Sequence, residues 1–143
     1  MKKFTVVFFL LACTANISFS HEVIYEGLSK PESVAEGSDG FIYVSEIGEM
    51  DKDGDGKISK IDKKGNITPF ATGLYDPKGI VFYKNKLYVT DRDVIIEVNT
   101  DGTWSVFGST MAFPKTPVFL NDIDVDSDGN FYITDTSNFK TGG

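Results

Sequence analysis

A unit that recurs about every 45 residues restricts the fold of this chain more than any other feature of its sequence. Segments 41–46, 86–91 and 130–135 share the order apolar residue, tyrosine, apolar residue, hydroxyl residue and acid, and their tyrosines are 45 and 44 residues apart. Each segment follows a turn and a shorter apolar run, such as 79–83. Such regular spacing indicates a chain built from structural units of one design.

The second half of the unit consists of a further pair of strand-like runs. Residues 57–62 lead through a Lys-Gly turn into 66–70, and residues 94–98 lead through an Asp-Gly turn into 103–107. Turns of this kind between β-branched and aromatic runs indicate hairpins, and no amphipathic helical stretch follows residue 20. Four short strands in roughly 40–50 residues are typical of a β-propeller blade. The sequence therefore predicts an all-β fold of antiparallel four-stranded blades.

The repeat divides the chain into units of about residues 29–74, 75–117 and 118–143, and the third unit ends after its second strand. We expect about two and a half blades of an incomplete ring, because closure takes at least about four. Residues 22–26 are patterned like the outer strand at 68–70, which predicts a strand that completes the last blade. We expect a truncated gene product; the alternative is a small protein that completes its ring by oligomerising. The fragment alone should be inactive and poorly soluble, because its terminal blade exposes an unpaired edge.

The N-terminus has the pattern of a bacterial secretory signal peptide. A positive start at residues 1–3 precedes an apolar stretch over 4–12, which is too short to span a bilayer. Serines at positions 18 and 20 then favour cleavage after Ser20. We expect residues 1–20 to be removed from a periplasmic or secreted propeller domain over 21–143. The alternative is a lipoprotein acylated at Cys13, because residues 10–13 resemble a lipobox.

Export would leave a chain with little chemistry beyond oxygen ligands. After cleavage, 123 residues would remain, with no cysteine, one histidine at position 21 and a formal charge of −9 instead of −7. Disulfides, an interior Ser-His-Asp triad and a histidine-based zinc site are therefore excluded. An acidic chain without a basic stripe argues against nucleic acid and anionic membranes as partners. Carboxylates, amides, hydroxyls and a hard metal ion remain.

One position of the unit is predicted to lie at the mouth of the central channel. In a propeller the first strand of each blade lines the channel, so equivalent residues of successive blades converge on its axis. Counting back from the repeat tyrosines, this position is Glu32, Lys78 and Asn121. A carboxylate and an amide oxygen are ligands that Ca²⁺ prefers, and Asp122 follows directly. The alternative is that Glu32 and Asn121 are turn residues that cap strand starts.

The sequence resembles the gluconolactonase and regucalcin-type family over most of residues 27–138. Residues 31–34 and then 39–44 look like the opening blade of that family, and residues 120–126 and then 128–135 are similar to its Asn-Asp blade motif. NHL-type and related six-bladed propellers share the Asp-Gly-apolar-Tyr-Val pattern, so the motifs are moderately specific.

The resemblance implies a six-bladed ring with one divalent metal, often Ca²⁺, that polarises a lactone carbonyl and orients water. By resemblance, Glu32 matches the first-blade metal ligand. Asn121 matches the asparagine that lines the metal or substrate pocket, and Asp122 is assigned with it to substrate binding. The remaining ligands and the general-base aspartate of the family come from later blades. Lys78 matches no ligand.

A second, local metal motif lies between two expected strands. Residues 51–58 read as positions 1 to 8 of a calcium loop, with glycine at position 6 and acids at positions 1, 3 and 5, namely Asp51, Asp53 and Asp55. Position 12 is Asp62, which an extended chain would carry away from the ion, and no helix flanks the loop, so this is not an EF-hand. Glu49 is a possible extra ligand. Three acids this close repel unless a cation relieves them; the alternative is a solvated Asp-Gly turn.

Two functions are compatible with these features. The first is the N-terminal part of an exported, divalent-metal-dependent lactone or ester hydrolase of the gluconolactonase type, acting on a small lactone or sugar-derived substrate. The second is a non-catalytic, NHL-like propeller that binds a ligand or a protein through its channel face. The fold hosts both, so it does not decide between them.

Overall fold

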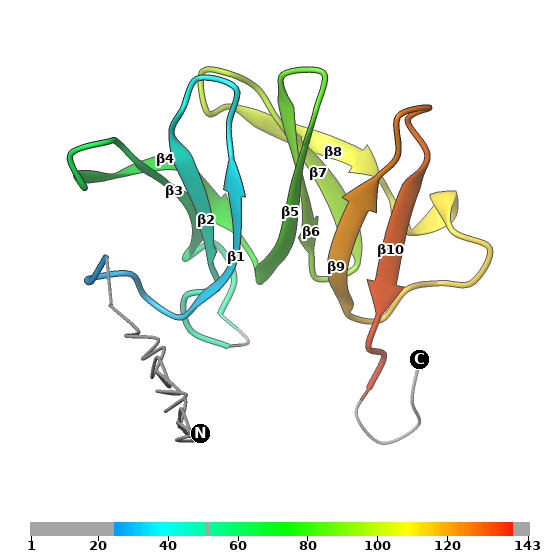
Figure 1. Cartoon of the computed structure of the whole chain (residues 1–143). Coiled ribbons are helices and arrows are strands. Elements are labelled where there is room, and N and C mark those ends of the chain that lie inside the picture. The colour runs from blue at the N-terminus through cyan, green and yellow to red at the C-terminus, as the bar shows by residue number, and fades with distance from the viewer. Residues whose placement is uncertain (1–24, 51, 139–143) are drawn as a thin grey trace, which may run out of the picture.

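The computed structural model describes residues 25–50 and 52–138, which form three antiparallel sheets (Figure 1). The expected signal peptide and its cleavage site lie outside the described residues. The strands of the first sheet are β1 (Pro31–Glu36), β2 (Ile42–Glu46), β3 (Gly56–Ile61) and β4 (Ile67–Leu74). Those of the second are β5 (Pro77–Tyr83), β6 (Lys86–Asp91), β7 (Val94–Val98) and β8 (Trp104–Gly108). The third contains β9 (Leu120–Val125) and β10 (Phe131–Asp135).

Each sheet is a meander in which neighbours in sequence are neighbours in space, in the orders β1-β2-β3-β4 and β5-β6-β7-β8, with β9 paired to β10. The prediction of antiparallel four-stranded blades with an incomplete third unit is confirmed. The strands of each sheet lie within the unit boundaries drawn from the repeat. One three-residue 3₁₀ turn, η1 (Thr110–Ala112), is the only helical element within 25–50 and 52–138. Over that same part of the chain, no helix has the length and apolarity needed to cross a membrane.

Aspartate side chains build several of the turns between strands. Between β9 and β10, the Oδ1 atom of Asp126 accepts hydrogen bonds from the amides of Asp128 and Asn130, at 3.0 and 2.9 Å, and Gly129 takes φ of +90°. An aspartate acceptor followed by a glycine in the left-handed region is the chemistry that tight turns require. These Asp-Gly turns explain why the hairpin pattern was readable from the sequence.

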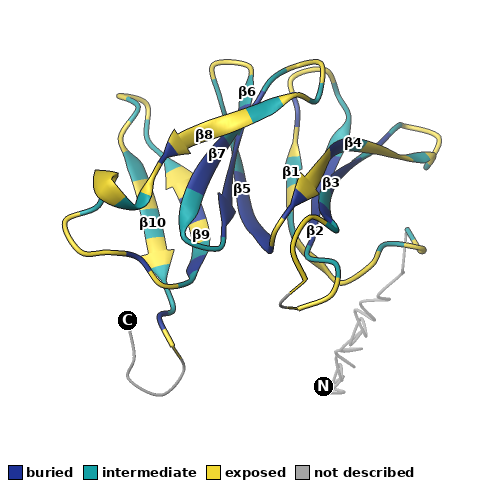
Figure 2. Cartoon of the chain, turned by 180° about the vertical axis from the view of Figure 1, so that it is seen from behind, coloured by how far each residue is buried: buried dark blue, intermediate teal, exposed yellow. Residues whose placement is uncertain are grey.

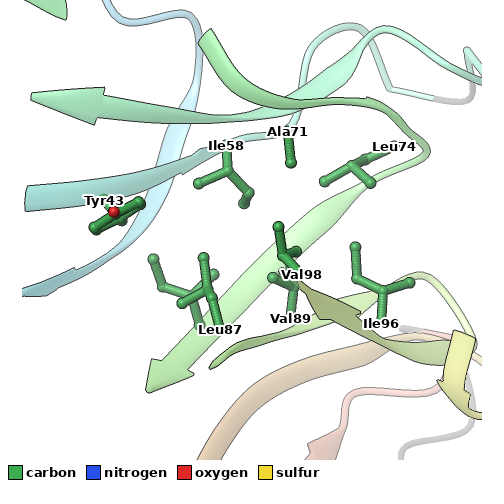
Figure 3. Packing of buried hydrophobic residues seen from close by; sticks show 9 residues of the cluster. Tyr43, Ile58, Ala71, Leu74, Leu87, Val89, Ile96 and Val98 are labelled. Carbon is green, nitrogen blue, oxygen red and sulfur yellow. The ribbon is translucent and has the colours of Figure 1, made fainter. Parts of the chain in front are cut away.

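The three sheets are arranged so that their first strands lie side by side. β5 contacts β1 on one side and β9 on the other, as Figure 1 shows. The main hydrophobic core lies between the first two sheets, and its residues are close-packed and almost fully buried (Figure 3). They come from both sheets: Tyr43, Ile58, Ala71, Leu74, Ile80, Leu87, Val89, Ile96 and Val98. A smaller core of Tyr88, Ile95, Leu120 and Ile123 joins the second sheet to the third. Neighbouring blades are therefore held together by the packing of one sheet face against the next.

The repeat tyrosine is a packing residue at each junction. The ring of Tyr43 lies edge-on to Phe70 of its own sheet and to Phe82 of the next, with ring centroids 5.1 and 5.0 Å apart. Tyr88 lies edge-on to Phe107 of its own sheet, at 4.9 Å, and its ring is tilted against that of Phe131 in the third sheet, at 4.7 Å. Edge-to-face aromatic pairs add about 0.5–1.5 kcal/mol beyond their buried area. The tyrosine thus joins one unit to the next.

Trp104 packs against the main core, and its indole N–H donates to the carbonyl of Thr72 on the outer strand of the first sheet, at 2.9 Å. The outer strand expected over residues 22–26 is only partly described. Tyr25 and Glu26, the described part of that segment, belong to no strand. The ring of Tyr25 lies instead beside Gly65 in the turn between β3 and β4.

Candidate functional site at the channel mouth

The strand register places Glu32, Lys78 and Asn121 at the same position of their units. In each inner strand the preceding residue pairs with the acid that ends the second strand: Pro31 with Glu46, Pro77 with Asp91 and Leu120 with Asp135. The pairing is irregular just after this point in β1 and β5 and at the corresponding point of β10, which marks a bulge at the strand entrance. Bulges at such places re-aim side chains. Counting back from the repeat tyrosines therefore identified structurally equivalent positions in the three units.

Glu32 is electrostatically coupled to the two neighbouring units. Burial raises the pKa of the Glu32 carboxyl, the Lys78 ammonium opposes that rise, and the Asp122 carboxylate adds to it. Lys78 is buried, and its Nζ lies 4.8 Å from the centre of the Phe119 ring. One carboxylate from the first unit, one ammonium from the second and one carboxylate from the third thus act on one another at the same end of the inner strands.

The backbones of the second and third inner strands are in direct contact at this end. A Cβ atom on Gly79 would lie 2.7 Å from the Cα of Asp122 and 2.8 Å from the backbone nitrogen of Ile123, which leaves room for glycine alone. The hydroxyl of Thr90 donates to the carbonyl of Asn121, at 2.8 Å. In the first unit, the hydroxyl of Ser45 donates in the same way to the carbonyl of Lys78, at 2.6 Å. The hydroxyl residue of the repeat therefore fixes the channel-mouth residue of the next unit through its main chain.

The acid that ends each second strand has a structural role that the sequence interpretation did not assign. Asp91 accepts from the amides of Tyr75 and Asp76, at 3.0 and 2.7 Å, and Asp135 accepts from the amides of Val118 and Phe119 in the same loop of the next unit, both at 3.0 Å.

Glu46, in the first unit, accepts from the amide of Ser29, and Lys57 lies 3.5 Å away. Each acid therefore binds the loop that leads into its own inner strand. The sequence does carry a signal for this role, because an acid directly follows the hydroxyl residue in all three units.

The candidate calcium loop is only partly described, since Asp51 lies outside the described residues. Asp53 accepts from the guanidinium of Arg92, at 2.8 Å. Asp55 accepts from the amide of Glu49, at 3.0 Å, and that bond lowers the pKa of its carboxyl below the usual range. Lys52 lies 3.5 Å from Asp55. Cationic side chains thus relieve part of the repulsion among these acids.

The second oxygen of Asp55 and the side chain of Asp62 complete the account of the loop. Asp55 Oδ1 is buried and has no hydrogen-bond partner among the described residues. Asp62 accepts from the amides of Lys64 and Asn66 in the next turn, at 2.8 and 2.9 Å. It therefore belongs to that turn, and β3 is extended from Gly56 onward. Whether the loop binds calcium stays a prediction.

The oxygen donors at the channel mouth suit a hard cation but form an incomplete set. Among residues 25–50 and 52–138, no three histidine, cysteine, aspartate or glutamate side chains lie close enough together to hold a metal ion by themselves. Glu32, Asn121 and Asp122 carry two carboxylates and one amide oxygen, which are donor types that Ca²⁺ prefers. Glu32 is an exposed residue, yet partial burial raises the pKa of its carboxyl, and a nearby positive charge would lower that pKa.

The structure is similar to solved β-propellers. One is a protein assigned as a gluconolactonase, with a TM-score of 0.58 and 19% identity over 76% of this chain and 42% of that protein. Virginiamycin B lyase from Staphylococcus aureus has a TM-score of 0.59 and 19% identity, over 82% of this chain and 38% of the lyase. A streptogramin B lyase has a TM-score of 0.50 and 18% identity, over 75% and 41%.

These similarities establish the fold as that of β-propeller blades. The chain spans about two fifths of the length of each of these proteins. No protein-family model and no curated protein matches the sequence.

Proposed function

We propose that this chain forms the opening units of an exported β-propeller enzyme that hydrolyses a lactone or related ester with the help of a divalent cation, Ca²⁺, at the channel mouth. The observation that carries the proposal is the coupling of Glu32, Lys78 and Asp122, which three successive units bring to one end of the inner strands. The likeness to a protein assigned as a gluconolactonase supports it.

Each residue at the channel mouth has a role in this proposal. Glu32 and Asn121 are the cation ligands within this chain, and Asp122 orients the substrate together with Asn121. A bound cation of this kind supplies Lewis-acid polarisation of an ester carbonyl. The Lys78 ammonium favours the ionised form of Glu32, because it opposes part of the effect of burial on the Glu32 carboxyl. The general base and the remaining ligands belong to further units of the ring.

A second candidate function is binding without catalysis, through the same channel face. Lys78 favours it, because this buried ammonium already gives Glu32 and Asp122 a counter-charge within the protein. The channel mouth would then recognise a polar ligand or a protein segment with its mixed charges. The two functions differ in whether the site takes up a divalent cation.

Calcium titration by calorimetry, on the chain joined to the further units that complete the ring, tests the metal in the proposal. We expect Glu32→Gln to abolish the channel-mouth binding event and Glu36→Gln, a change at an exposed position of the same strand, to leave it intact. A double variant, Asp53→Asn with Asp55→Asn, separates the candidate loop site from the channel site. Because the pKa of Glu32 is raised, binding should weaken on acidification at a pH above the ordinary carboxyl value of 4.5. A completed ring that takes up no Ca²⁺ at the channel mouth contradicts the metal proposal.

Activity is tested separately, by hydrolysis of gluconolactone with and without a chelator. We expect no turnover by the present chain and chelator-sensitive turnover once further units complete the ring. Turnover that is indifferent to chelation would remove the metal mechanism. A complete ring that binds a ligand but hydrolyses no lactone would favour the second function.

A further inference from the structure

A pocket of about 210 Å³ lies between the first and second sheets, at the end of the inner strands opposite the channel mouth. The turns that follow β1, β5 and β7 surround it, and Figure 1 shows these turns at that end of the molecule. We call this space, with Tyr43 and Leu87 on its floor and Asn85 and Thr100 at its mouth, the junction pocket. Both sheets that form it have all four strands within the described residues, and the proposed function makes no use of it.

The floor and walls of the junction pocket are aromatic and aliphatic. Tyr43 and Leu87 are 4% and 1% exposed, and Figure 3 shows them at the same end of the main core. Phe70 and Phe82 form the walls, each edge-on to Tyr43. An apolar cavity of about 150 Å³ lined by such side chains is large enough to bind benzene. The junction pocket therefore has room for one six-membered ring with a small substituent.

The junction between the second and third sheets shows how a space of this kind is filled. Leu87 directly precedes the repeat tyrosine of its unit, and Phe131 has the same position in the third unit. The ring of Phe131 packs against those of Tyr88 and Phe107, with ring centroids 4.7 and 5.4 Å apart. The equivalent tyrosine and phenylalanine of the first sheet line the junction pocket. Leucine places no ring between them, so the space stays open.

An exchange of size on the inner strand does not close the pocket. Phe82 is the strand partner of Leu87, and the smaller Val125 is the strand partner of Phe131. The Phe82 ring thus takes up part of the junction from β5. The rest, toward the turn that contains Thr100, is the junction pocket.

The mouth of the junction pocket carries neutral polar side chains from both units. The hydroxyl of Ser38 donates to the Oδ1 atom of Asn85, at 3.2 Å, which joins two turns beside the opening. Within the described residues, the hydroxyl of Thr100 has no hydrogen-bond partner. Figure 2 shows the corresponding change from the buried strands β6 and β7 to the exposed turns at their ends. A ligand at the mouth can therefore gain a hydrogen bond without breaking one within the protein.

The one carboxylate that lines the junction pocket among the described residues is already paired. Asp39 accepts from the ammonium of Lys60, at 2.9 Å, and from the hydroxyl of Tyr43, at 2.8 Å. An organic cation would therefore compete with Lys60 for this acid. The formal charge of −7 on the chain disfavours an organic anion. The chemistry of the mouth thus selects a neutral ligand.

We propose that the junction pocket binds a small neutral phenol. The aromatic ring takes the place beside Tyr43 and Phe70 that the Phe131 ring takes at the second junction, and the hydroxyl group bonds to Thr100 at the mouth. Because such a ligand contacts two sheets, its binding also stabilises the contact between the first and second units. The site is separate from the channel mouth, so it does not depend on the proposed hydrolysis.

Titration with phenol tests this site on the chain joined to further units that complete the ring, with NMR of the methyl groups of Leu87 and Val98 as the readout. We expect both sets of signals to shift and to saturate, because an aromatic ring changes the shielding of nuclei packed against it. Cyclohexanol lacks the aromatic ring and toluene lacks the hydroxyl. Each should bind about two- to tenfold more weakly than phenol, the range that one aromatic pair or one hydrogen bond supplies.

Leu87→Phe should abolish phenol binding, because the new ring fills the junction pocket as Phe131 fills the second junction, and the Val98 signals still report. Val118→Phe adds the same ring at an exposed position near the channel mouth and should bind phenol like the unsubstituted protein.

A second pair of variants tests the hydrogen bond at the mouth. Thr100→Val should weaken phenol binding about two- to tenfold and leave toluene binding unchanged. Thr72→Val, at an exposed position of β4, is its control. Circular dichroism checks that each variant is folded. Thr100→Trp, which covers the mouth from an exposed turn, replaces Leu87→Phe if that variant is unfolded.

Signals that do not move with phenol, or that move equally in the Leu87→Phe variant, overturn the proposal. Equal binding of cyclohexanol overturns the choice of an aromatic ligand, and equal or tighter binding of toluene overturns the hydrogen bond at the mouth. None of these outcomes bears on calcium uptake at the channel mouth, so the two proposals fail separately.

Discussion

At the scale of single residues, side chains near the entrance of each inner strand fall into two classes. Those that end the second strand bind backbone amides and shape the entrance, as Asp91 does for Tyr75 and Asp76. Those near the start of the inner strand, Glu32, Lys78 and Asp122, interact through charge across units. The first class holds the loop through its backbone amides, and the second carries the binding role proposed above.

Removing the carboxylate of Asp91 should destabilise the second unit. Asp91→Ala leaves the amides of Tyr75 and Asp76 without their acceptor in a buried place, and an unsatisfied buried donor costs about 1–3 kcal/mol. Asp93→Ala, two residues on, removes an acid that takes no part in these bonds and serves as the control. Urea unfolding monitored by Trp104 fluorescence measures the difference. Equal midpoints for the two variants would contradict the assigned role.

The roles of single side chains were the least predictable part of the site. The sequence predicts that Glu32, Lys78 and Asn121 are equivalent, because that follows from counting within a repeat. It does not predict that Lys78 is buried beside Glu32, because the bulge at the strand entrance sets the direction of the side chain. Nor does it predict that Asp53 pairs with Arg92, since 39 residues separate them and only the packing of two units brings them together.

At the scale of strands and sheets, the sequence was a reliable guide. Asp-Gly and Lys-Gly turns at fixed places between β-branched runs predicted the hairpins, and the structure confirms the four-stranded meanders. The strand predicted over 22–26 is only partly tested: Tyr25 and Glu26 belong to no strand, and the rest of the segment lies outside the described residues. A strand needs a neighbouring strand to pair with, and the pattern of apolar and polar residues alone does not supply one.

The junction between β5 and β9 depends on the absence of a side chain at Gly79. Gly79→Ala would place a methyl group 2.7 Å from the Cα of Asp122, where only backbone movement makes room, and we expect a loss of about 1–3 kcal/mol. Gly108→Ala is the matched control, because its Cβ would first meet the flexible end of Ile95, at 3.3 Å. Chemical denaturation of both variants tests this. A Gly79 variant as stable as the control would show that the two strands can separate without cost.

At the scale of the whole molecule, stability should depend on pH through carboxylates that the turns hold ionised. Hydrogen bonds from the side chain and amide of Asn130 lower the pKa of Asp126 to about 2. A similar bond, donated by Thr103, lowers the pKa of Asp101. A carboxyl with a lowered folded-state pKa contributes stability above its unfolded value, near 3.9, and loses it as the pH falls through the folded value.

The chain should therefore lose stability progressively below about pH 4. Thermal unfolding across this range, measured by circular dichroism, gives the profile. Asp126→Asn should flatten its most acidic part, down to about pH 2, while leaving the profile at neutral pH unchanged in shape. A profile that is flat between neutral pH and pH 2 would contradict the assigned bonds.

Export is the remaining prediction for the whole molecule. Expressed in a bacterium with two membranes, the protein should be recovered from the periplasm or medium with His21 as its first residue. N-terminal sequencing of the recovered protein measures this, and Cys13→Ala should not alter it. Recovery with a lipid-modified Cys13 at the N-terminus would instead support the lipoprotein alternative.

The hydroxyl residues have a consequence for how the ring tolerates change. Ser45 and Thr90 recognise Lys78 and Asn121 by their carbonyl oxygens, which every amino acid possesses. One of these positions is a cation and the other a neutral amide, yet the bond across the junction is the same. The hydrogen bond between neighbouring units is thus independent of the side chain at the channel mouth. A substitution that changes what the channel mouth binds need not disturb the contact between neighbouring blades.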